Sequence, residues 1–403
     1  MSSAGPPTSP PRDRADACPG ALQTHSAADG ELARVRVPGG LLRADQLRVL
    51  AAAAIELGNG ALELTSRGNV QLRGLRPGAA GELGDRLAAA GLLPSDSHET
   101  ARNLLGSVLS GRAGGRLDAR PWVRAFDAGL CADPSLAALP GRFLATFDDG
   151  RGDVAALDGD VGLLALSPGS VALTLAGADS GLRAGPAGAV ALALAATRAF
   201  LAERAVQGGS AWRLAELADG RARVAARVAG ARVGVPAEPR VEVPAGARVE
   251  VPAEPQVRPI GAVPQDDGRT ALAAVVPLGR LTAAQLTLLA DLAAEVQLTP
   301  WRGVVVPDLA DGSAAALLVE AGLVLDPDSP WTRVTACAGL PGCARSLADV
   351  RADATAAVMV GSLPAGGARQ HWAGCERRCG RPGGAVVDVV ATGSGYRIDA
   401  PTA

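Results

Sequence analysis

The chain contains no lysine and few aromatic residues. Its 39 cationic side chains are therefore all arginines, apart from three histidines. Aromatic residues make up 2% of the chain, whereas 48% of its residues are apolar, so the interior must be built mainly from Ala, Val and Leu. With 403 residues, the chain is long enough for two or three domains that each bury a core.

A strong charge imbalance and long apolar runs are also missing. The formal net charge of -2 argues against a protein that grips nucleic acid or an anionic membrane through long-range charge. Residues 1–16 are rich in Ser and Pro and lack the apolar stretch of a secretory signal, which predicts a disordered tail. Arg, Asp, Glu or Gly interrupts every Ala-rich stretch, so we expect a soluble, cytoplasmic protein.

Cysteine is too scarce for a disulfide scaffold, because a chain of this length has only six. Four of them form two pairs, Cys337 with Cys343 and Cys375 with Cys379, separated by five and three residues respectively. Four thiolates from two loops can hold tetrahedral zinc or a cubane iron-sulfur cluster. Structural zinc usually takes tighter pairs, so the spacing favours iron and predicts these four cysteines as metal ligands.

An internal repeat is the most informative architectural feature. Its copies start near Ala33 and Ala273, and matching prolines and glutamines stand 239 positions apart (38 and 277, 46 and 285). Each copy predicts a strand, a helix that begins after Arg43 or Thr282, a second strand and a second helix that ends at a glycine. This order predicts two ferredoxin-like half-domains.

A different segment follows each copy of the repeat. Arg102 in the first aligns with Arg333 in the second, and this alignment places Gly106 where Cys337 stands. Only the second segment therefore has cluster ligands, and we expect the first to face the substrate.

A proline-rich spacer separates the two halves. It contains three eight-residue units, RVGVPAEP, RVEVPAGA and RVEVPAEP, which begin at 232, 240 and 248. Regular proline prevents helix formation, so we expect an extended spacer that folding does not require. The predicted division of the chain is a tail at 1–16, half-domain 1 at 17–95, a cluster-free reductase-type domain at 96–230, the spacer at 231–264, half-domain 2 at 265–330 and a cluster domain at 331–403.

The repeat, the motifs LTSRGNVQL and TARN, and the paired cysteines resemble the nitrite/sulfite reductase superfamily. The resemblance implies an α+β fold. It combines duplicated ferredoxin-like half-domains with two nitrite/sulfite reductase-type α/β domains in a pseudo-two-fold arrangement. In this superfamily the last cysteine bridges two cofactors, a role that would fall on Cys379.

Within the superfamily, the segments DGELARVRVPGG, CAGLPGCARSLADVRADA and HWAGCERRCGRP most resemble the precorrin-3B synthases. That resemblance implies an oxygen-dependent monooxygenase of aerobic cobalamin biosynthesis, which hydroxylates precorrin-3A and closes a lactone to give precorrin-3B. It also implies a [4Fe-4S] cluster, a mononuclear non-haem iron, dioxygen, and NADH or another reductant. We see no nucleotide-binding motif, so we expect electrons from a separate reductase or donor.

The chain departs from the reductases at a basic site. By motif, Arg67 and Arg102 match the two arginines of the reductases and Arg142 matches the first of two lysines, whereas Leu144 occupies the place of the second. Loss of one cation weakens the case for a small-anion substrate. We expect the three arginines to bind precorrin carboxylates, because planar guanidinium groups suit such partners.

Other residues leave their roles open. His25, His98 and His371 are the only histidines, and no two are close enough in sequence to form a typical ligand pair for iron. Cys18 and Cys131 stand apart from the two pairs, and no catalytic residue is assigned. Two alternatives remain open, namely a sirohaem-dependent sulfite or nitrite reductase and a non-catalytic electron carrier.

Overall fold

The computed structural model describes residues 18–230, 248–252 and 258–401. The predicted tail and most of the predicted spacer lie outside these residues. The chain divides into two compact units. Unit 1 is formed mainly by residues 94–258, and unit 2 by residues 19–93 and 259–403. No helix in the described ranges is long and apolar enough to cross a membrane.

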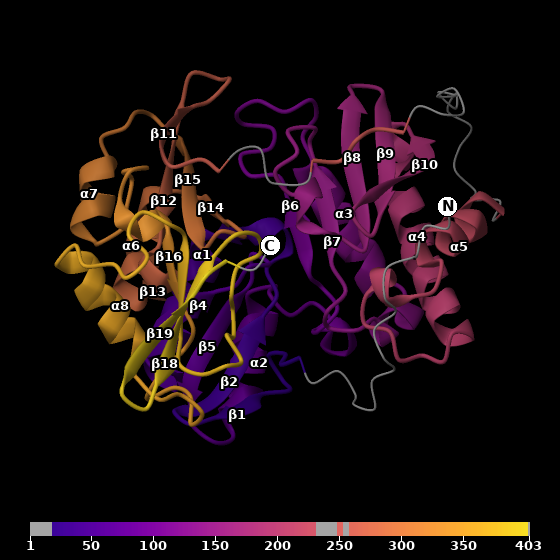
Figure 1. Ribbon diagram of the computed structural model, residues 1–403. Coiled ribbons are helices and arrows are strands. Elements are labelled where there is room, and N and C mark those ends of the chain that lie inside the picture. The colour runs from indigo at the N-terminus through magenta and orange to yellow at the C-terminus, as the bar shows by residue number, and fades with distance from the viewer. Residues whose placement is uncertain (1–17, 231–247, 253–257, 402–403) are drawn as a thin grey trace. The chain divides into compact units, whose positions relative to one another are not determined.

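Unit 2 contains both copies of the repeat (Figure 1). The first copy forms β1 (His25–Ala27), β2 (Gly30–Val35), β3 (Leu41–Arg43), α1 (Ala44–Leu57), β4 (Ala61–Leu64), β5 (Val70–Leu75) and α2 (Ala79–Ala89). The second forms β11 (Gly261–Pro264), β12 (Thr270–Val275), β13 (Arg280–Thr282), α6 (Ala283–Leu292), β14 (Glu295–Leu298), β15 (Gly303–Leu309) and α7 (Ala315–Glu320). The prediction of duplicated ferredoxin-like half-domains is confirmed.

The two half-domains exchange a strand. One sheet has the order β1-β2-β5-β4-β13, and the other has the order β11-β12-β15-β14-β3. Leu281 of β13 pairs with Leu62 of β4, and Leu42 of β3 pairs with Val296 of β14. Each sheet is therefore completed by the other copy, and a single apolar core contains residues of both.

Short turns before the exchanged strands make this crossing possible. Gly40 has a φ of 72°, and a Cβ atom at this position would lie 2.1 Å from the carbonyl oxygen of Leu298. Only glycine allows the backbone to approach so closely. The helix ends also follow the sequence, since Gly91 and Gly322 after α2 and α7 have φ values of 70° and 84°.

The rest of unit 2 forms a four-stranded sheet, which we call sheet D, with the order β16-β17-β18-β19. Its elements are β16 (Val334–Ala336), α8 (Val350–Met359), β17 (Gln370–Ala373), β18 (Val387–Thr392) and β19 (Gly395–Asp399). The first three strands are parallel and β19 is antiparallel. Helix α8 packs on one face of the sheet, against Val334, Trp372 and Val389.

Unit 1 repeats this strand order in a five-stranded sheet, which we call sheet C. Its elements are β6 (Leu104–Gly106), α3 (Arg120–Cys131), β7 (Ala145–Asp148), β8 (Val161–Ser167), β9 (Ser170–Leu175), β10 (Ala178–Ala184), α4 (Pro186–Val206) and α5 (Gly220–Gly230). Strands β6, β7 and β8 are parallel, and β9 and β10 follow antiparallel. Sheets C and D are thus two versions of one topology.

Candidate functional site

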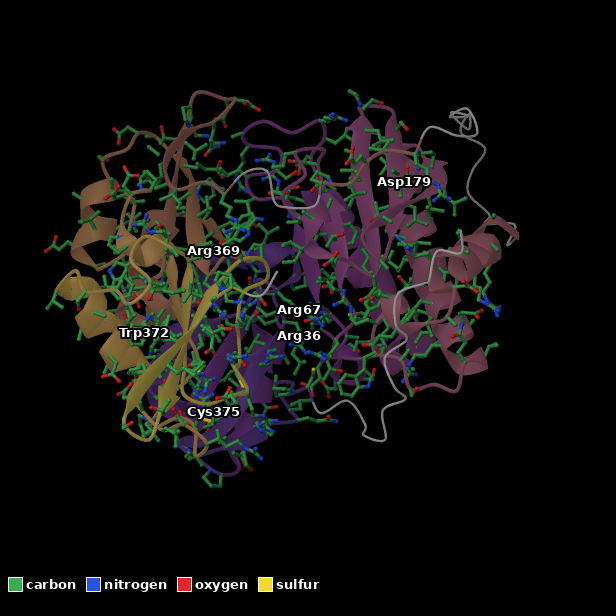
Figure 2. The ribbon with its side chains drawn as sticks, in the orientation of Figure 1. Arg36, Arg67, Asp179, Arg369, Trp372 and Cys375 are labelled. Atoms are coloured by element: carbon green, nitrogen blue, oxygen red, sulfur yellow. The ribbon has the colours of Figure 1, made fainter. Side chains whose placement is uncertain are left out.

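The four predicted ligand cysteines lie in two loops at one edge of sheet D. Cys337 follows β16 directly, and Cys343 lies further along the same loop. Cys375 and Cys379 belong to the loop after β17, and Figure 2 labels Cys375 beyond the strand that carries Trp372. Because β16 and β17 are parallel, their carboxyl ends meet at the same edge, which brings both loops together.

Hydrogen bonds hold these two loops against each other. The N–H of Cys337 donates to the carbonyl of Trp372 over 2.9 Å, and the N–H of Gly374 donates to the Cys337 sulfur over 3.2 Å. Position 374 admits only glycine, because a Cβ atom there would lie 1.8 Å from the Ser346 hydroxyl oxygen. The first ligand is therefore fixed relative to the second loop.

Cys379 is close enough to the other three cysteines for their charge to affect its thiol. The pKa of Cys379 is raised by burial and then by Cys337, Cys375 and Cys343, whereas Arg377 opposes the rise. Nevertheless, no three His, Cys, Asp or Glu side chains in the described ranges converge on a point where one ion would bind. Zinc needs four ligand atoms within about 2.1–2.3 Å of a single centre. Four thiols on two loops match the ligand number of either a zinc ion or a cubane iron-sulfur cluster.

An arginine from the first half-domain supports the first cysteine loop. Arg73 of β5 pairs with Asp29 over 2.9 Å and donates to the carbonyl of Gly342, the residue before Cys343. The side chain of Arg73 is only 9% exposed, so this contact is buried. The sequence contained no signal for this role, because Arg73 lies about 270 residues before the loop that it supports.

A second arginine holds the other end of the same loop. Arg351 donates to the carbonyl of Cys337 over 3.1 Å and pairs with Glu63 of β4 over 2.7 Å. Arg302, the repeat partner of Arg67, donates to the carbonyl of Gly380 over 2.6 Å. The cysteine loops are thus attached to both half-domain sheets.

His371 lies in β17 and is fully buried beneath the second cysteine loop. Its Nδ1 atom is 2.9 Å from the Thr335 hydroxyl, and the ring also lies beside the backbone of Cys379. Burial and then the nearby Arg302 lower the pKa of His371 to about 3, so the ring is neutral at physiological pH.

The other two histidines lie elsewhere. His98 is buried in unit 1, where Ser95 contacts its Nδ1 atom over 2.8 Å and the carbonyl of Asp133 contacts its Nε2 atom over 3.0 Å. His25 is exposed on the edge strand β1. Within neither unit do the histidines form a set of ligands with a carboxylate.

The predicted substrate arginines occupy three different environments. Arg67 is half-buried in the turn between β4 and β5 of unit 2. Arg102 is buried in unit 1 and forms two 2.7 Å hydrogen bonds to the carboxylate of Asp127. Arg142 is exposed in unit 1 and lies over the ring of Trp212, at 5.6 Å from its centroid.

Leu144, at the place of the missing lysine, belongs to an apolar cluster. It is buried and packs with Leu105 and Val154. Its N–H donates to the buried carboxylate of Asp160 over 2.8 Å. A charged side chain at this position would have to leave that cluster or be desolvated.

The loops of sheet C correct the predicted alignment by one residue. The N–H of Ser107 donates to the carbonyl of Phe147 over 3.0 Å, the same bond that Cys337 makes with Trp372. The Ser107 hydroxyl in turn accepts the N–H of Asp149, just as the Cys337 sulfur accepts that of Gly374. Ser107 is therefore the counterpart of Cys337, so the alignment with Gly106 is wrong.

The alignment of Arg102 with Arg333 is wrong by the same step. The carbonyl of Asn103 accepts the N–H of Ala145 over 3.0 Å, and the carbonyl of Arg333 accepts the N–H of Gln370 over 2.8 Å. Asn103 is therefore the counterpart of Arg333. Sequence matching could not detect this shift, since the backbone ladder rather than side-chain identity defines the equivalence.

Carboxylates fill the region of sheet C that corresponds to the second cysteine loop. Asp148 is fully buried and accepts hydrogen bonds from four backbone N–H groups, at 2.9 to 3.1 Å. Asp153 is buried and accepts from the Ser107 hydroxyl over 2.6 Å and from the N–H of Val108 over 2.8 Å. Burial and the charge of Asp148 raise the pKa of Asp153 to about 7.

Comparison with known proteins agrees with the duplicated fold. The model of the nitrite/sulfite reductase ferredoxin-like half domain matches residues 25–90 and 263–322, one range in each copy of the repeat. A ferredoxin–nitrite reductase of Synechococcus elongatus is 30% identical over 411 residues, which cover 91% of this chain and 77% of the relative. The chain belongs to the nitrite and sulfite reductase family.

Other members of the family are more distant or match a shorter stretch. A precorrin-3B synthase of Sinorhizobium sp. is 26% identical over 392 residues, which cover 96% of this chain and 82% of the relative. A ferredoxin–nitrite reductase of Leptolyngbya laminosa is 34% identical over 117 residues, which cover 27% of this chain and 23% of the relative. The NirA protein of Mycobacterium tuberculosis has the same fold, with a TM-score of 0.68 at 21% identity over 91% of this chain and 74% of that chain.

Proposed function

We propose that this member of the nitrite and sulfite reductase family is an iron-sulfur monooxygenase that converts precorrin-3A to precorrin-3B. Cys337, Cys343, Cys375 and Cys379 would hold a [4Fe-4S] cluster. When bound, that cluster would supply electrons one at a time. The similarity to a precorrin-3B synthase over nearly the whole chain supports this assignment.

The environment of Arg102 carries the proposal. A reductase of a small anion needs positive charge at its substrate, because charge-assisted hydrogen bonds hold and polarise nitrite or sulfite. Here Asp127 neutralises Arg102 through two short hydrogen bonds, and the position of the second lysine is the buried Leu144. Two of the four positions thus contribute no net positive charge, which suits a large substrate better than a small anion.

The other two arginines are proposed as substrate contacts. The exposed guanidinium of Arg142 is held in place by Trp212, so it can bind a carboxylate with little loss of side-chain freedom. Arg67 would bind a second carboxylate, and Arg102 would orient its surroundings through Asp127. NADH or another reductant, delivered through a separate electron donor, and dioxygen remain part of the proposal.

The residues present do not fit a mononuclear non-haem iron within either unit. Such an iron commonly uses two histidines and a carboxylate on one face. Both ring nitrogens of His98 are already engaged, and His25 and His371 lie on different sheets of unit 2, so they do not form a pair on one face. We therefore assign no step to this iron.

A second candidate is a sirohaem-dependent nitrite or sulfite reductase. The identity of 30% with a ferredoxin–nitrite reductase over 77% of its length favours it. In that case Cys379, which is exposed, would bridge the cluster and the sirohaem.

One set of measurements on anaerobically purified protein separates these functions. Iron and acid-labile sulfide are quantified, tetrapyrrole is extracted, and the protein is then supplied with a reductant and either precorrin-3A under oxygen or nitrite without it. We expect about four iron atoms per chain in the cluster, no extracted sirohaem, an oxygen-dependent product from precorrin-3A, and no nitrite consumption.

Sirohaem together with nitrite consumption would replace the proposal by the second candidate. A chain that carries the cluster and turns over neither substrate would be an electron carrier. The double variant Asp127→Asn/Leu144→Lys provides a control, since it restores charge at both positions. It should bind nitrite more tightly than the parent if these positions explain the lost preference for anions.

A further inference from the structure

Five described residues of the spacer, Arg248 to Pro252, lie on sheet C of unit 1. Figure 1 shows them as a short coloured trace between two grey stretches that runs past β8 and β9. The N–H of Val249 donates to the carboxylate of Asp179 over 2.8 Å. Val249 and Val251 pack against a small buried apolar cluster that includes Leu164. The spacer therefore has a binding site on its own chain.

This binding site, which we call the cradle, consists of Asp179 and four apolar residues. The apolar residues lie on the short 3-10 helix η4 (Ala155–Leu157), on β8 and on β9, and are Ala155, Leu164, Leu166 and Ala172. Alternate residues of the same strands, such as Leu163 and Leu173, belong to the core on the opposite face, where α4 packs. The spacer thus covers the face of sheet C that its helices leave open.

Asp179 is held ready to accept a backbone N–H group. It lies on β10, is labelled in Figure 2, and is 7% exposed. Arg183 pairs with it through two 2.6 Å hydrogen bonds, and the N–H of Gly181 donates to it over 2.9 Å. A charge-assisted bond from Val249 completes this arrangement.

Side-chain exposure alternates along the docked segment. Arg248 and Glu250 are exposed, whereas Val249 and Val251 are half-buried. The cradle therefore contacts the two valines and one backbone N–H group, and the residue between the valines faces solvent.

The other two spacer units have the same residue types at the positions that face the cradle in the docked unit. The five positions read RVGVP at 232–236, RVEVP at 240–244 and RVEVP at 248–252. The single difference within them is Gly234, which corresponds to the exposed Glu250. The units at 232 and 240 lie outside the described residues, but they match the docked unit at every position that the cradle contacts.

We propose that the cradle is a docking site for V-x-V-P segments, and that all three spacer units of the same chain compete for it. The docked unit fixes the length of chain left free before unit 2 begins at Pro259. That length is six residues (253–258) when the third unit is docked, 14 (245–258) for the second and 22 (237–258) for the first. Exchange of units changes the tether between units 1 and 2 in steps of eight residues.

The absence of lysine allows a direct test. An introduced lysine is the only side-chain amine in the chain, so an amine-reactive diazirine attaches there and at the N-terminus alone. Three variants, Gly234→Lys, Glu242→Lys and Glu250→Lys, place this photoreactive group at the outward position of each unit. After illumination of the full-length protein, peptide mapping by mass spectrometry identifies the residues that each lysine contacts.

We expect all three lysines to cross-link to the same strands of sheet C, β8 to β10. The substitutions Val249→Ser/Val251→Ser remove the apolar contacts of the third unit. Added to the Glu242→Lys variant, they should increase its yield of cross-links to sheet C severalfold. Serine at all six valines should abolish the adducts on sheet C for every lysine, whereas the N-terminal adducts should remain as an internal control.

Two results would overturn the proposal. In the first, only Glu250→Lys cross-links to sheet C, and the serine pair in the third unit does not redirect the others. In the second, the adducts join separate chains, which light scattering of the cross-linked product would reveal as a doubled mass.

Discussion

Sheets C and D use one strand order for two different purposes. In sheet D, Cys337 follows the first strand and Cys375 and Cys379 follow the second. In sheet C, the corresponding loops carry Ser107 and the buried carboxylates of Asp148 and Asp153. The same backbone bonds position Ser107 and Cys337, so the two loops differ in side-chain chemistry rather than in path.

The difference indicates how hydrogen bonds to carboxylates can hold a loop of the duplicated scaffold in place without a cofactor. Asp148 gathers four N–H groups of its loop around one carboxylate, and Asp153 connects that loop to Ser107. These internal bonds satisfy four buried N–H groups of this loop. In unit 2, arginines anchor the loops from outside and leave the four thiols available to bind a cofactor.

The largest expected effect is on iron content. Replacement of any one of the four paired cysteines by serine should reduce cluster iron and sulfide to near zero, because a cubane needs a ligand at each corner. Iron and sulfide analysis after anaerobic purification measures this. Cys131→Ser, at the end of α3 in unit 1, is the matched control and should keep the full iron content. Loss of iron in this control would show that the comparison of the two sheets is wrong.

Asp148→Ala should strongly destabilise unit 1 and leave the cluster intact. It removes the acceptor of four buried N–H groups, so we expect the free energy of unfolding to fall by about 3 kcal/mol or more. Urea denaturation followed by circular dichroism measures the loss. The exposed Asp85→Ala in α2 should change it by less than about 0.5 kcal/mol. If Asp148→Ala left the free energy of unfolding unchanged, the hydrogen bonds to this carboxylate would not be what holds the loop in place.

Asp153 should make stability depend on pH. Its pKa is raised to about 7 in the folded protein, so the folded state binds its proton more tightly than the unfolded state. This contribution is complete below about pH 4, the unfolded value, and is lost as the pH rises to about 7. Through Asp153, the free energy of unfolding should fall by at most about 1.4 kcal/mol per pH unit. Urea unfolding between pH 4.5 and 7 measures this change.

Asp153→Asn should remove this contribution, so the stability of the variant relative to the wild type should increase as the pH rises from 4.5 to 7. Asp148→Asn should move the loss of the Asp153 contribution to lower pH, because the charge of Asp148 is the second cause of the raised pKa. Because the pKa of His371 is lowered to about 3, that residue contributes a slope of opposite sign below about pH 6.5, so the test compares the variant with the wild type. A stability difference between Asp153→Asn and the wild type that stays constant from pH 4.5 to 7 would contradict the assignment. Carboxylates with a lowered pKa, such as Asp118, lose their contribution below about pH 4 and do not interfere.

The smallest expected effect concerns the two copies of the first repeat helix. At the start of α6, the Thr282 hydroxyl accepts the N–H of Gln285, and the N–H of Thr282 donates to the Gln285 side chain. At the start of α1, the side chain of Arg43 has no hydrogen-bond acceptor. Thr282→Ala should cost about 1 kcal/mol of unfolding free energy, and Arg43→Thr should gain up to about 1 kcal/mol. Thermal and urea denaturation check both, and equal effects of opposite sign would support the symmetry of the copies.

Local features of the fold could be predicted because nearby residues determine them. Arg43 and Thr282 correctly located the starts of α1 and α6, and the glycines after α2 and α7 take the left-handed conformation expected of them. The cysteine spacing likewise placed four thiols on two loops, and the structure brings those loops to one sheet edge. The substrate arginines remain predictions, although Asp127 shows that Arg102 already has a partner.

Contacts between distant segments could not be predicted. Arg73 stands far in sequence from Gly342, and Arg351 stands far from its partner Glu63, and a single sequence contains no record of such pairing. The predicted alignment of the first loop of sheet C was also wrong by one residue. The hydrogen bonds between paired strands, and not residue identities, define which positions correspond.

The sequence by itself determined the duplicated half-domains, the helix ends and the two pairs of cysteines, since period, caps and spacing are properties of neighbouring residues. Only the tertiary structure decided that the half-domains exchange strands, that carboxylates close the loops of unit 1, and that one spacer unit docks beside Asp179. These features depend on which surfaces meet after folding, where burial and hydrogen-bond satisfaction select the partners.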